Sequence, residues 1–140
     1  FMMGLSAGYH NLDDFRSGKR PCGANETFWL EQEERMFAIF KKVIALGLLP
    51  VCGTDAGTGG TRFDETWLEL ALMVRRGCLS AREAIRIGTA QSAACLGLTR
   101  ETGAIGEGLS ADLIALETDP ITCIEALAHP ARVMAQGRLV

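Results

Sequence analysis

The feature that most constrains the fold is a short apolar run, Leu48-Leu49-Pro50-Val51-Cys52. It lies between a stretch of helical periodicity and a glycine-rich loop, and a run of this length bounded by glycine is typical of a strand buried in a parallel sheet. Parallel strands are joined by crossover helices. Glycine is frequent, at 16 of 140 residues, against roughly 7% in average proteins, and strand-to-helix turns often need its positive φ. We therefore predict an α/β fold.

The residues before this run, from about 27 to 46, are predicted to form an amphipathic helix. Apolar side chains recur there at helical spacing, namely Trp29, Met36, Phe40 and Val43. The opposite face carries the charged residues Glu31, Glu33, Glu34, Lys41 and Lys42. Acids early and bases late match the helix dipole, and Gly47 is the expected left-handed stop.

Two further helices are predicted after the glycine-rich loop. Asp64 is the expected N-cap of a helix over about 65–76. Its inward face is predicted to carry Leu68, Leu72 and Met73. Ser80 and Glu83 have the spacing of a capping box, which opens a helix over 81–96.

The two ends of the chain have different patterns. Residues 1–26 show no sustained periodicity and are predicted to be a long loop, with at most one more strand of the sheet, in residues 1–9. The tail has the patterns of a strand at about 112–116, a short helix at about 121–127, and a final strand made of residues 132–135 and then 138–140. We therefore predict two units, residues 1–98 and residues 99–140, the second rich in β-structure.

Composition excludes several kinds of function. The net charge is −3 and no basic stripe runs along the sequence, so nucleic acid is not an expected partner. No stretch approaches the ~18 apolar residues of a membrane span, and the first residues lack the pattern of a signal peptide. The five cysteines are odd in number and contain no CxxC pair, which argues against a zinc knuckle and a disulfide framework. We expect a cytoplasmic protein that binds no membrane.

Asp55 is the strongest candidate for a catalytic residue. It follows the apolar run within Gly53-Thr54-Asp55-Ala56-Gly57. In α/β folds, the loops after the carboxyl ends of strands carry the functional groups. An Asp at this place can also simply bond its own backbone in an Asx-turn, and the residues alone leave both interpretations open.

The same loop does not fit two phosphate-binding motifs. A Walker A loop needs a lysine, and no lysine occurs after Lys42, while a dinucleotide fingerprint needs a third glycine where Arg62 stands. The form Gly53-x-Asp55-x-Gly57 is similar to the nucleophile elbow of α/β-hydrolases, with Asp in place of serine. That weaker alternative requires a helix that begins at once after the loop.

In combination, four stretches resemble the metal-dependent amidohydrolase superfamily, in its imidazolonepropionase-like and Xaa-Pro-dipeptidase-like branch. Residues 49–57 are similar to the last barrel strand with its aspartate, and residues 69–97 to the helices that follow it. Residues 103–113 are similar to the re-entry into the small β-sandwich domain, and residues 130–140 to its closing strand. The resemblance covers about residues 28–140.

The resemblance implies the C-terminal part of a (β/α)₈ TIM barrel followed by part of a small β-sandwich domain. It implies a hydrolase that cleaves carbon–nitrogen bonds in a small amide, cyclic amide or dipeptide, with Asp55 as ligand of a divalent metal, Zn²⁺ in first place, and as proton shuttle. The family's other metal ligands lie upstream of that aspartate. His10 is expected to be a loop residue, His129 a surface residue and Asp112 a turn carboxylate. We therefore expect this chain alone to be inactive and to bind no metal stoichiometrically.

The last expectation concerns assembly. A parallel strand is normally paired on both edges, and this chain supplies at most one neighbour for residues 48–52. Apolar patches that mark an interface are expected on the helices that carry Trp29, Phe37, Phe40, Trp67, Leu68 and Leu72. We expect a homo-oligomer, and the alternative function is a non-catalytic oligomeric module derived from the family.

Overall fold

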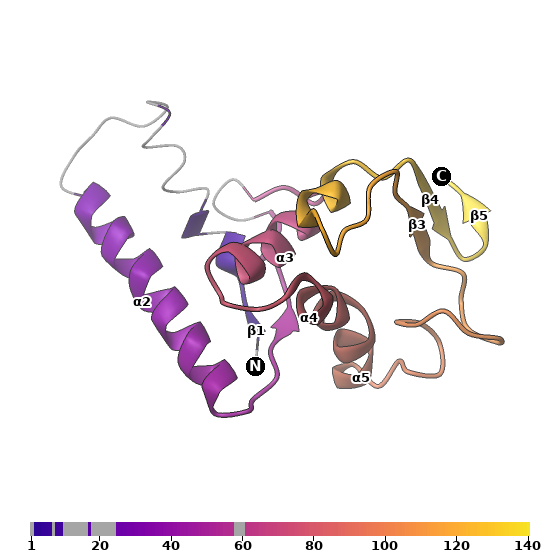
Figure 1. Cartoon of the computed structure of the whole chain (residues 1–140), viewed down its shortest axis with the longest axis horizontal. Coiled ribbons are helices and arrows are strands. Elements are labelled where there is room, and N and C mark those ends of the chain that lie inside the picture. The colour runs from indigo at the N-terminus through magenta and orange to yellow at the C-terminus, as the bar shows by residue number, and fades with distance from the viewer. Residues whose placement is uncertain (1, 7, 10–16, 18–24, 58–60) are drawn as a thin grey trace.

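A computed structural model describes residues 2–6, 8–9, 17, 25–57 and 61–140, and confirms the α/β class (Figure 1). The helices are α2 (Asn25–Ala45), α3 (Thr66–Arg75), α4 (Ala81–Arg86), the π-helix η1 (Ile87–Gln91), α5 (Ser92–Cys95) and the 3-10 helix η2 (Ile124–Ala128). The strands are β1 (Met2–Met3), β2 (Val51–Cys52), β3 (Leu113–Ala115), β4 (Arg132–Ala135) and β5 (Arg138–Leu139). Of the helices in the described ranges, none is long and apolar enough to cross a membrane.

β1 and β2 form a parallel pair, in which Met2 lies opposite Val51. β1 is the second strand that was expected within residues 1–9. The strand predicted for 48–52 is too long, because Leu48 and Leu49 are exposed and proline has no N–H to donate to a ladder. The pair is therefore short, and other contacts must hold it in place.

The long loop predicted for residues 1–26 is wrong in its described parts. Residues 5–6 and 8–9 are helical, and α2 begins at Asn25. Leu5 and Ser6 are fully buried, and both backbone N–H groups donate to the side chain of Glu69. The expectation for His10 falls outside the described residues and stays a prediction.

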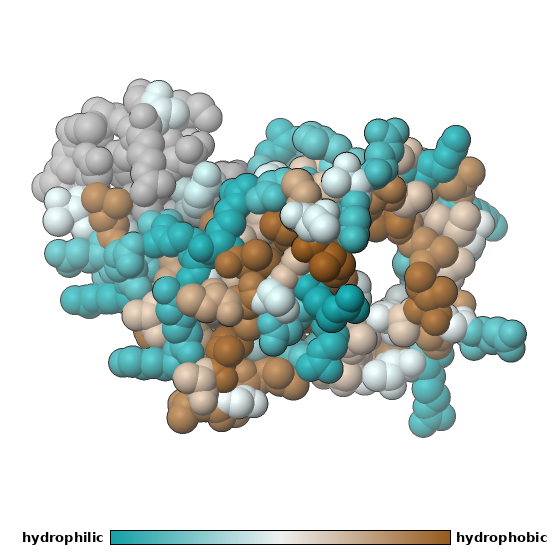
Figure 2. Space-filling model, in the orientation of Figure 1, coloured by the Kyte–Doolittle hydropathy of each residue, from teal (hydrophilic) through white to brown (hydrophobic). Residues whose placement is uncertain are grey.

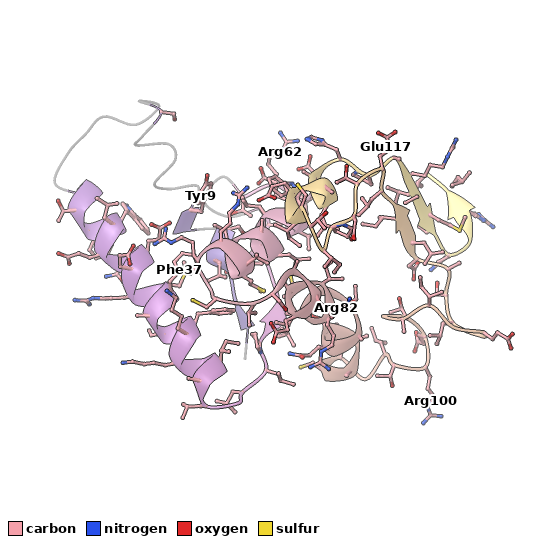
Figure 3. All side chains as sticks on the ribbon, in the orientation of Figure 1. Tyr9, Phe37, Arg62, Arg82, Arg100 and Glu117 are labelled. Carbon is pink, nitrogen blue, oxygen red and sulfur yellow. The ribbon has the colours of Figure 1, made fainter. Side chains whose placement is uncertain are left out.

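α2 confirms the amphipathic helix, with one correction. Phe37 and Phe40 are buried, and Phe37 faces the rest of the chain (Figure 3). Glu33, predicted on the charged outer face, is only 3% exposed. Its Oε2 atom lies 3.1 Å from Nη1 of Arg76, whose guanidinium carbon is 4.5 Å from the centroid of the Phe37 ring. A buried carboxylate needs such a partner, and periodicity alone does not show it.

α3 confirms the inward face predicted for Leu68, Leu72 and Met73, which are 1–4% exposed. Asp64 as its N-cap is wrong. Glu65 occupies the N-cap position without a side-chain cap bond, and the Asp64 carboxylate instead accepts hydrogen bonds of 2.8 and 2.6 Å from Arg62. A guanidinium two residues away offers two charge-assisted bonds, which are stronger than one bond to a backbone N–H.

The third predicted helix is confirmed at its start and corrected in its middle. The capping box is present: Ser80 Oγ accepts from the Glu83 N–H, and Glu83 Oε2 accepts from the Ser80 N–H. The single helix predicted for 81–96 is interrupted by the π-helix η1, after which the backbone N–H of Ser92 reaches back to the carbonyl of Ile87. This widened turn displaces the residues that follow it relative to a regular α-helix.

The tail forms a three-stranded antiparallel sheet in the order β3-β4-β5, away from the helices at one end of the molecule (Figure 1). This confirms the strand predicted for 112–116. The final strand predicted over 132–140 is instead a hairpin of two strands, β4 and β5, and the helix predicted for 121–127 is η2, a few residues later. Gln136 and Gly137 both have positive φ in the β4–β5 turn, as a two-residue hairpin requires. Asp112 Oδ1 accepts from the Gln136 N–H at 2.8 Å, so Asp112 is a turn carboxylate, as predicted. The division at 98–99 stays a prediction.

The apolar core lies between α2, α3 and α4. It contains Leu5, Phe37, Phe40, Leu68, Leu72, Met73 and Ala84. Four of the six residues expected to form exposed patches are therefore buried within the chain, and that expectation is wrong for them. Figure 2 shows brown apolar side chains at the surface in several places. The exposed large apolar residues include Leu46, Leu48, Leu49 and Leu96, at 54–75%.

Candidate active site

The candidate site lies at the carboxyl edge of the parallel pair. Because β1 and β2 are parallel, the residues that follow them, Gly4 and Asp55, emerge at the same edge. Their contact is close: a Cβ placed on Gly4 would come 2.9 Å from Asp55 Oδ2 and 3.3 Å from its Cγ. A glycine at position 4 thus leaves the room that the Asp55 carboxylate occupies.

The Asp55 backbone has a left-handed conformation. Its φ is +51°, and the loop turns again at Gly57, where φ is +94°. The loop is fastened by the Ala56 N–H, which donates to Thr54 Oγ1, and by the Gly57 N–H, which donates to the Thr61 carbonyl. A non-glycine residue in this conformation costs about 1–2 kcal/mol, and such strained residues cluster at functional sites. Asp55 is exposed in this chain.

Glu69, on α3, binds the backbone of the residues that follow β1, and sequence reasoning did not identify this role. It is 0% exposed, and its two carboxylate oxygens accept the N–H groups of Leu5 and Ser6, each at 2.8 Å. Burial raises the pKa of Glu69 to about 7, against the opposing effect of the two N–H donors, and the charge of Asp55 adds to the rise. The only sequence signal was one carboxylate inside the apolar stretch 67–73.

Cys52 is the last residue of β2, the strand that leads to Asp55. Burial, and secondly the charge of Glu69, raise the pKa of its thiol to about 12. Thiolates, not thiols, are nucleophiles and metal ligands. Cys52 is therefore a packing residue at neutral pH, which leaves the carboxylates as the chemically active groups of this edge.

The residues present do not by themselves fit a complete metal site. Such a site takes three or four protein ligands, and within the part of the chain that the structure describes, no three His, Cys, Asp or Glu side chains are grouped to hold a metal. His129 lies on the surface, as predicted. Asp55 can offer one carboxylate.

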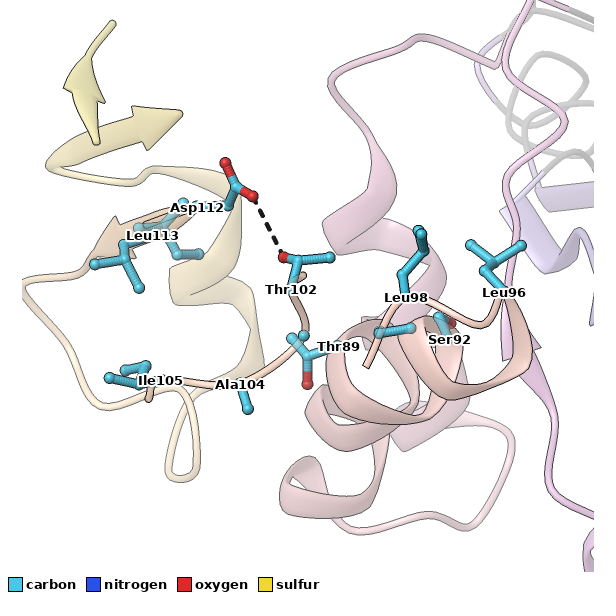
Figure 4. A pocket seen from close by; sticks show the side chains of 13 residues that line it. Thr89, Ser92, Leu96, Leu98, Thr102, Ala104, Ile105, Asp112 and Leu113 are labelled. Atoms are coloured by element: carbon cyan, nitrogen blue, oxygen red, sulfur yellow. Dashed lines mark hydrogen bonds between the residues drawn. The ribbon is translucent and has the colours of Figure 1, made fainter. Parts of the chain in front are cut away.

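A separate cavity of about 590 Å³ opens between the η1–α5 segment and the loop that leads to β3 (Figure 4). Its walls are mostly apolar, with Leu96, Leu98 and Leu113 among the lining residues. The Thr102 hydroxyl in its wall donates to Asp112 at 3.3 Å. Asp55 is not among the lining residues, so this cavity and the carboxyl edge of β2 are different places.

The chain belongs to the amidohydrolase family, whose sequence profile matches residues 31–140. It is 36% identical over 95 residues to ochratoxinase from Aspergillus niger, and the match covers 67% of this chain and 19% of that protein. The resemblance stated above is thereby confirmed at the level of the family.

Two solved structures extend the match over nearly the whole chain. A candidate prolidase from Bifidobacterium longum superposes with a TM-score of 0.83 at 33% identity, over 99% of this chain and 34% of that one. A Xaa-Pro dipeptidase with bound methionine in its active site superposes with a TM-score of 0.80 at 27% identity, over 98% and 33%. These neighbours are TIM-barrel amidohydrolases, and the chain spans about a third of their length. The predicted fold, the C-terminal part of such a barrel followed by part of a small β domain, is confirmed.

Proposed function

We propose that this chain is the part of an amidohydrolase that presents Asp55 to a substrate whose carbon–nitrogen bond is hydrolysed. An amide, a cyclic amide or a dipeptide fits this class. The relatives support it, since they include an ochratoxinase and a Xaa-Pro dipeptidase.

The observation that carries the proposal is the place of Asp55. It lies just beyond β2 at the carboxyl edge of a parallel pair, in a left-handed conformation, with Gly4 leaving room for its carboxylate. The carboxyl edge is where barrel enzymes of this kind hold their catalytic groups.

The chemistry asked of Asp55 is proton transfer. Its carboxylate accepts a proton from the water that attacks the carbonyl carbon, and returns it to the nitrogen as the carbon–nitrogen bond breaks. Water thus gives hydroxyl to the acyl product and a proton to the amine product.

The finer parts of the proposal rest on the family resemblance. Asp55 would be one ligand of a divalent metal, Zn²⁺ in first place, with the other ligands outside the described residues. The units 1–98 and 99–140 would be the barrel part and the small β domain. We further propose a homo-oligomer in the cytoplasm. The exposed apolar side chains of Leu46, Leu48 and Leu49 would be buried in its interface.

Of the two alternative functions, one is dropped and one is kept. A nucleophile elbow is not formed, because α3 begins only at Thr66 and not directly after Asp55. A non-catalytic oligomeric module derived from the family remains the second candidate, since no group of metal ligands lies within the described ranges.

The test uses the full-length protein that carries this chain, with Xaa-Pro dipeptides and N-acyl amino acids as substrates. Asp55→Asn keeps the shape of the side chain and removes the proton acceptor, so we expect kcat to fall by roughly 10²–10⁴-fold. Asp64→Asn, on the exposed end of the same loop, is the matched control and should keep full activity. Activity of D55N equal to that of D64N would refute the proposal, and absence of hydrolysis by the unsubstituted protein would favour the non-catalytic module.

A further inference from the structure

The segment that follows β1, residues 4–6, approaches the Asp55 loop at two places. A Cβ on Gly4 would come 2.9 Å from Asp55 Oδ2, so the Gly4 backbone lies directly beside the carboxylate. Ser6 Oγ lies 3.5 Å from the carbonyl oxygen of Thr54, the residue before Asp55. The position of residues 4–6 therefore limits where the Asp55 carboxylate can lie.

The side chain of Glu69, on α3, fastens this segment. Its Oε1 atom accepts the Leu5 N–H and its Oε2 atom accepts the Ser6 N–H, each at 2.8 Å. The Ser6 hydroxyl also forms a hydrogen bond with this carboxylate. Hydrogen bonds to an ionised carboxylate are short and roughly twice as strong as those between neutral groups. Because the Leu5 N–H belongs to the peptide group that joins Gly4 to Leu5, Glu69 fixes the orientation of the peptide beside Asp55.

These bonds lie inside the chain and do not take the place of a missing strand. Leu5, Ser6 and Glu69 are each 0% exposed. The two N–H groups belong to residues that are already helical, and the first N–H groups of a helix have no acceptor within the helix. A strand added beside β1 or β2 would pair with strand residues instead. We therefore expect the bonds of Glu69 to be kept in a complete barrel.

We propose that Glu69 is a positioning residue, which fixes residues 4–6 and thereby holds the Asp55 carboxylate in the orientation that proton transfer requires. The inference rests on the proposed function, because it concerns the carboxylate to which that function assigns the chemistry. A catalytic group that is misplaced by about 1 Å can slow the chemical step by about 10²-fold. The loss falls on kcat rather than on KM when the affected interaction is made only in the transition state.

The test is a double-mutant cycle in the full-length protein, with the substrates named above. Glu69→Gln keeps the shape of the side chain but turns an amide donor toward one of the two N–H groups. Gly4→Ala displaces the Asp55 carboxylate directly, through the 2.9 Å contact of the added Cβ. Glu83→Gln is the matched control, because the exposed Glu83 also accepts a backbone N–H at 2.8 Å, that of Ser80 at the start of α4.

At about pH 8, above the pKa of Glu69, we expect E69Q to lower kcat about tenfold, with KM within about twofold of its original value. G4A should lower kcat about 10²-fold. Because both substitutions displace the same carboxylate, the double variant should lose much less than the product of the two effects, roughly 10³-fold. E83Q should keep the original kcat.

Two results would overturn the inference. The first is a kcat of E69Q equal to that of E83Q. The second is a double variant that loses the full product of the two effects, because Glu69 would then act independently of the Asp55 carboxylate. If E69Q does not fold, Ser6→Ala, which removes the hydroxyl beside Thr54, takes its place in the cycle under the same criteria.

Failure of the proposed function has a different signature, namely absence of hydrolysis by the unsubstituted protein. Hydrogen–deuterium exchange of residues 53–57 then decides the inference. Faster exchange in E69Q than in E83Q would still support the placement of the Asp55 loop by Glu69, whereas equal exchange in the two variants would overturn it.

Discussion

The parallel pair and the antiparallel tail sheet are stabilised in different ways. β1 and β2 pair two residues each, from segments about fifty positions apart in the sequence, and closing so long a loop is entropically costly. The buried side chain of Glu69, on α3, binds the residues that follow β1, and the half-buried Ser92, at the η1–α5 junction, binds Cys52 of β2. In the tail, β4 and β5 are joined by a two-residue turn, and their contacts are local and exposed. The candidate site thus lies on the part whose geometry depends on distant side chains.

The largest expected effect is on the parallel pair. Glu69→Ala would leave the buried N–H groups of Leu5 and Ser6 without acceptors, at about 1–3 kcal/mol each. We expect the free energy of unfolding in urea to fall by roughly 2–5 kcal/mol. Glu107→Ala, at an exposed position of the tail, is the control and should stay within about 0.5 kcal/mol of the original protein. Equal effects of the two substitutions would remove the contrast between the regions.

A change of pH should change the stability of the two regions in opposite directions. Beside the parallel pair, the responsible group is Glu69. Its pKa is raised in the folded state to about 7 from an ordinary 4.5, so the folded state holds the proton more tightly than the unfolded state. The stabilisation that the Glu69 proton contributes is complete below about pH 4.5 and is lost as the pH rises to about 7. The difference between the two pKa values corresponds to a loss of about 3 kcal/mol in the free energy of unfolding. Urea unfolding between pH 5 and 8 measures this loss. Glu69→Gln should flatten the pH profile, and a profile that keeps its slope in E69Q would contradict the assignment.

Two glycines separate packing from backbone strain. A Cβ at Gly77 would lie 2.4 Å from the Met73 carbonyl oxygen and 2.6 Å from Phe40 Cε1, whereas at Gly137 nothing lies within 4 Å but φ is +78°. We expect Gly77→Ala to cost about 1–3 kcal/mol through overpacking and Gly137→Ala about 1 kcal/mol through its left-handed backbone. Gly137→Asn should recover part of the latter, because Asn tolerates that conformation. Thermal unfolding measures all three, and a larger loss in G137A than in G77A would contradict this order.

The smallest effect is expected in the tail at Asp112. The Gln136 N–H, followed by side-chain hydroxyls, lowers the pKa of Asp112, so its contribution is present above its ordinary pKa and is lost as the pH falls through the lowered value. The tail should therefore lose a little stability as the pH falls, and Asp112→Asn should remove this loss. The direction is opposite to that of Glu69, whose contribution to stability is lost as the pH rises. Exchange of the β4–β5 amides between pH 2 and 5 is the measurement, and an unchanged acid limb in D112N would show that the turn does not depend on this carboxylate.

The same contrast explains what the sequence could predict. The tail strands and the Ser80 capping box follow from local patterns, namely short apolar runs and the spacing of Ser80 and Glu83, and they were predicted. Asp112 was predicted as a turn carboxylate, but its partner Gln136 lies 24 positions away and was not predicted. Glu33 and Glu69 could not be placed, because each is buried by a partner far away in the sequence. The hydrogen bonds from Gln91 and Ser92 to β2 depend on where β2 lies, which no local pattern shows. Asp55 could be named as a candidate from the order of strand and loop together with the family resemblance, and its catalytic role stays a proposal. Its exposure could not be predicted.

The most direct test of the account is a crystal structure of the full-length protein with a phosphonate analogue of the tetrahedral intermediate, which amidohydrolases should bind more tightly than substrate. The account predicts that the Asp55 carboxylate lies within about 3 Å of a phosphonate oxygen or of an atom that binds it directly, the distance at which a proton can be transferred. An analogue bound elsewhere, with Asp55 facing solvent as it does in this chain, would contradict the claim that this carboxylate does the chemistry.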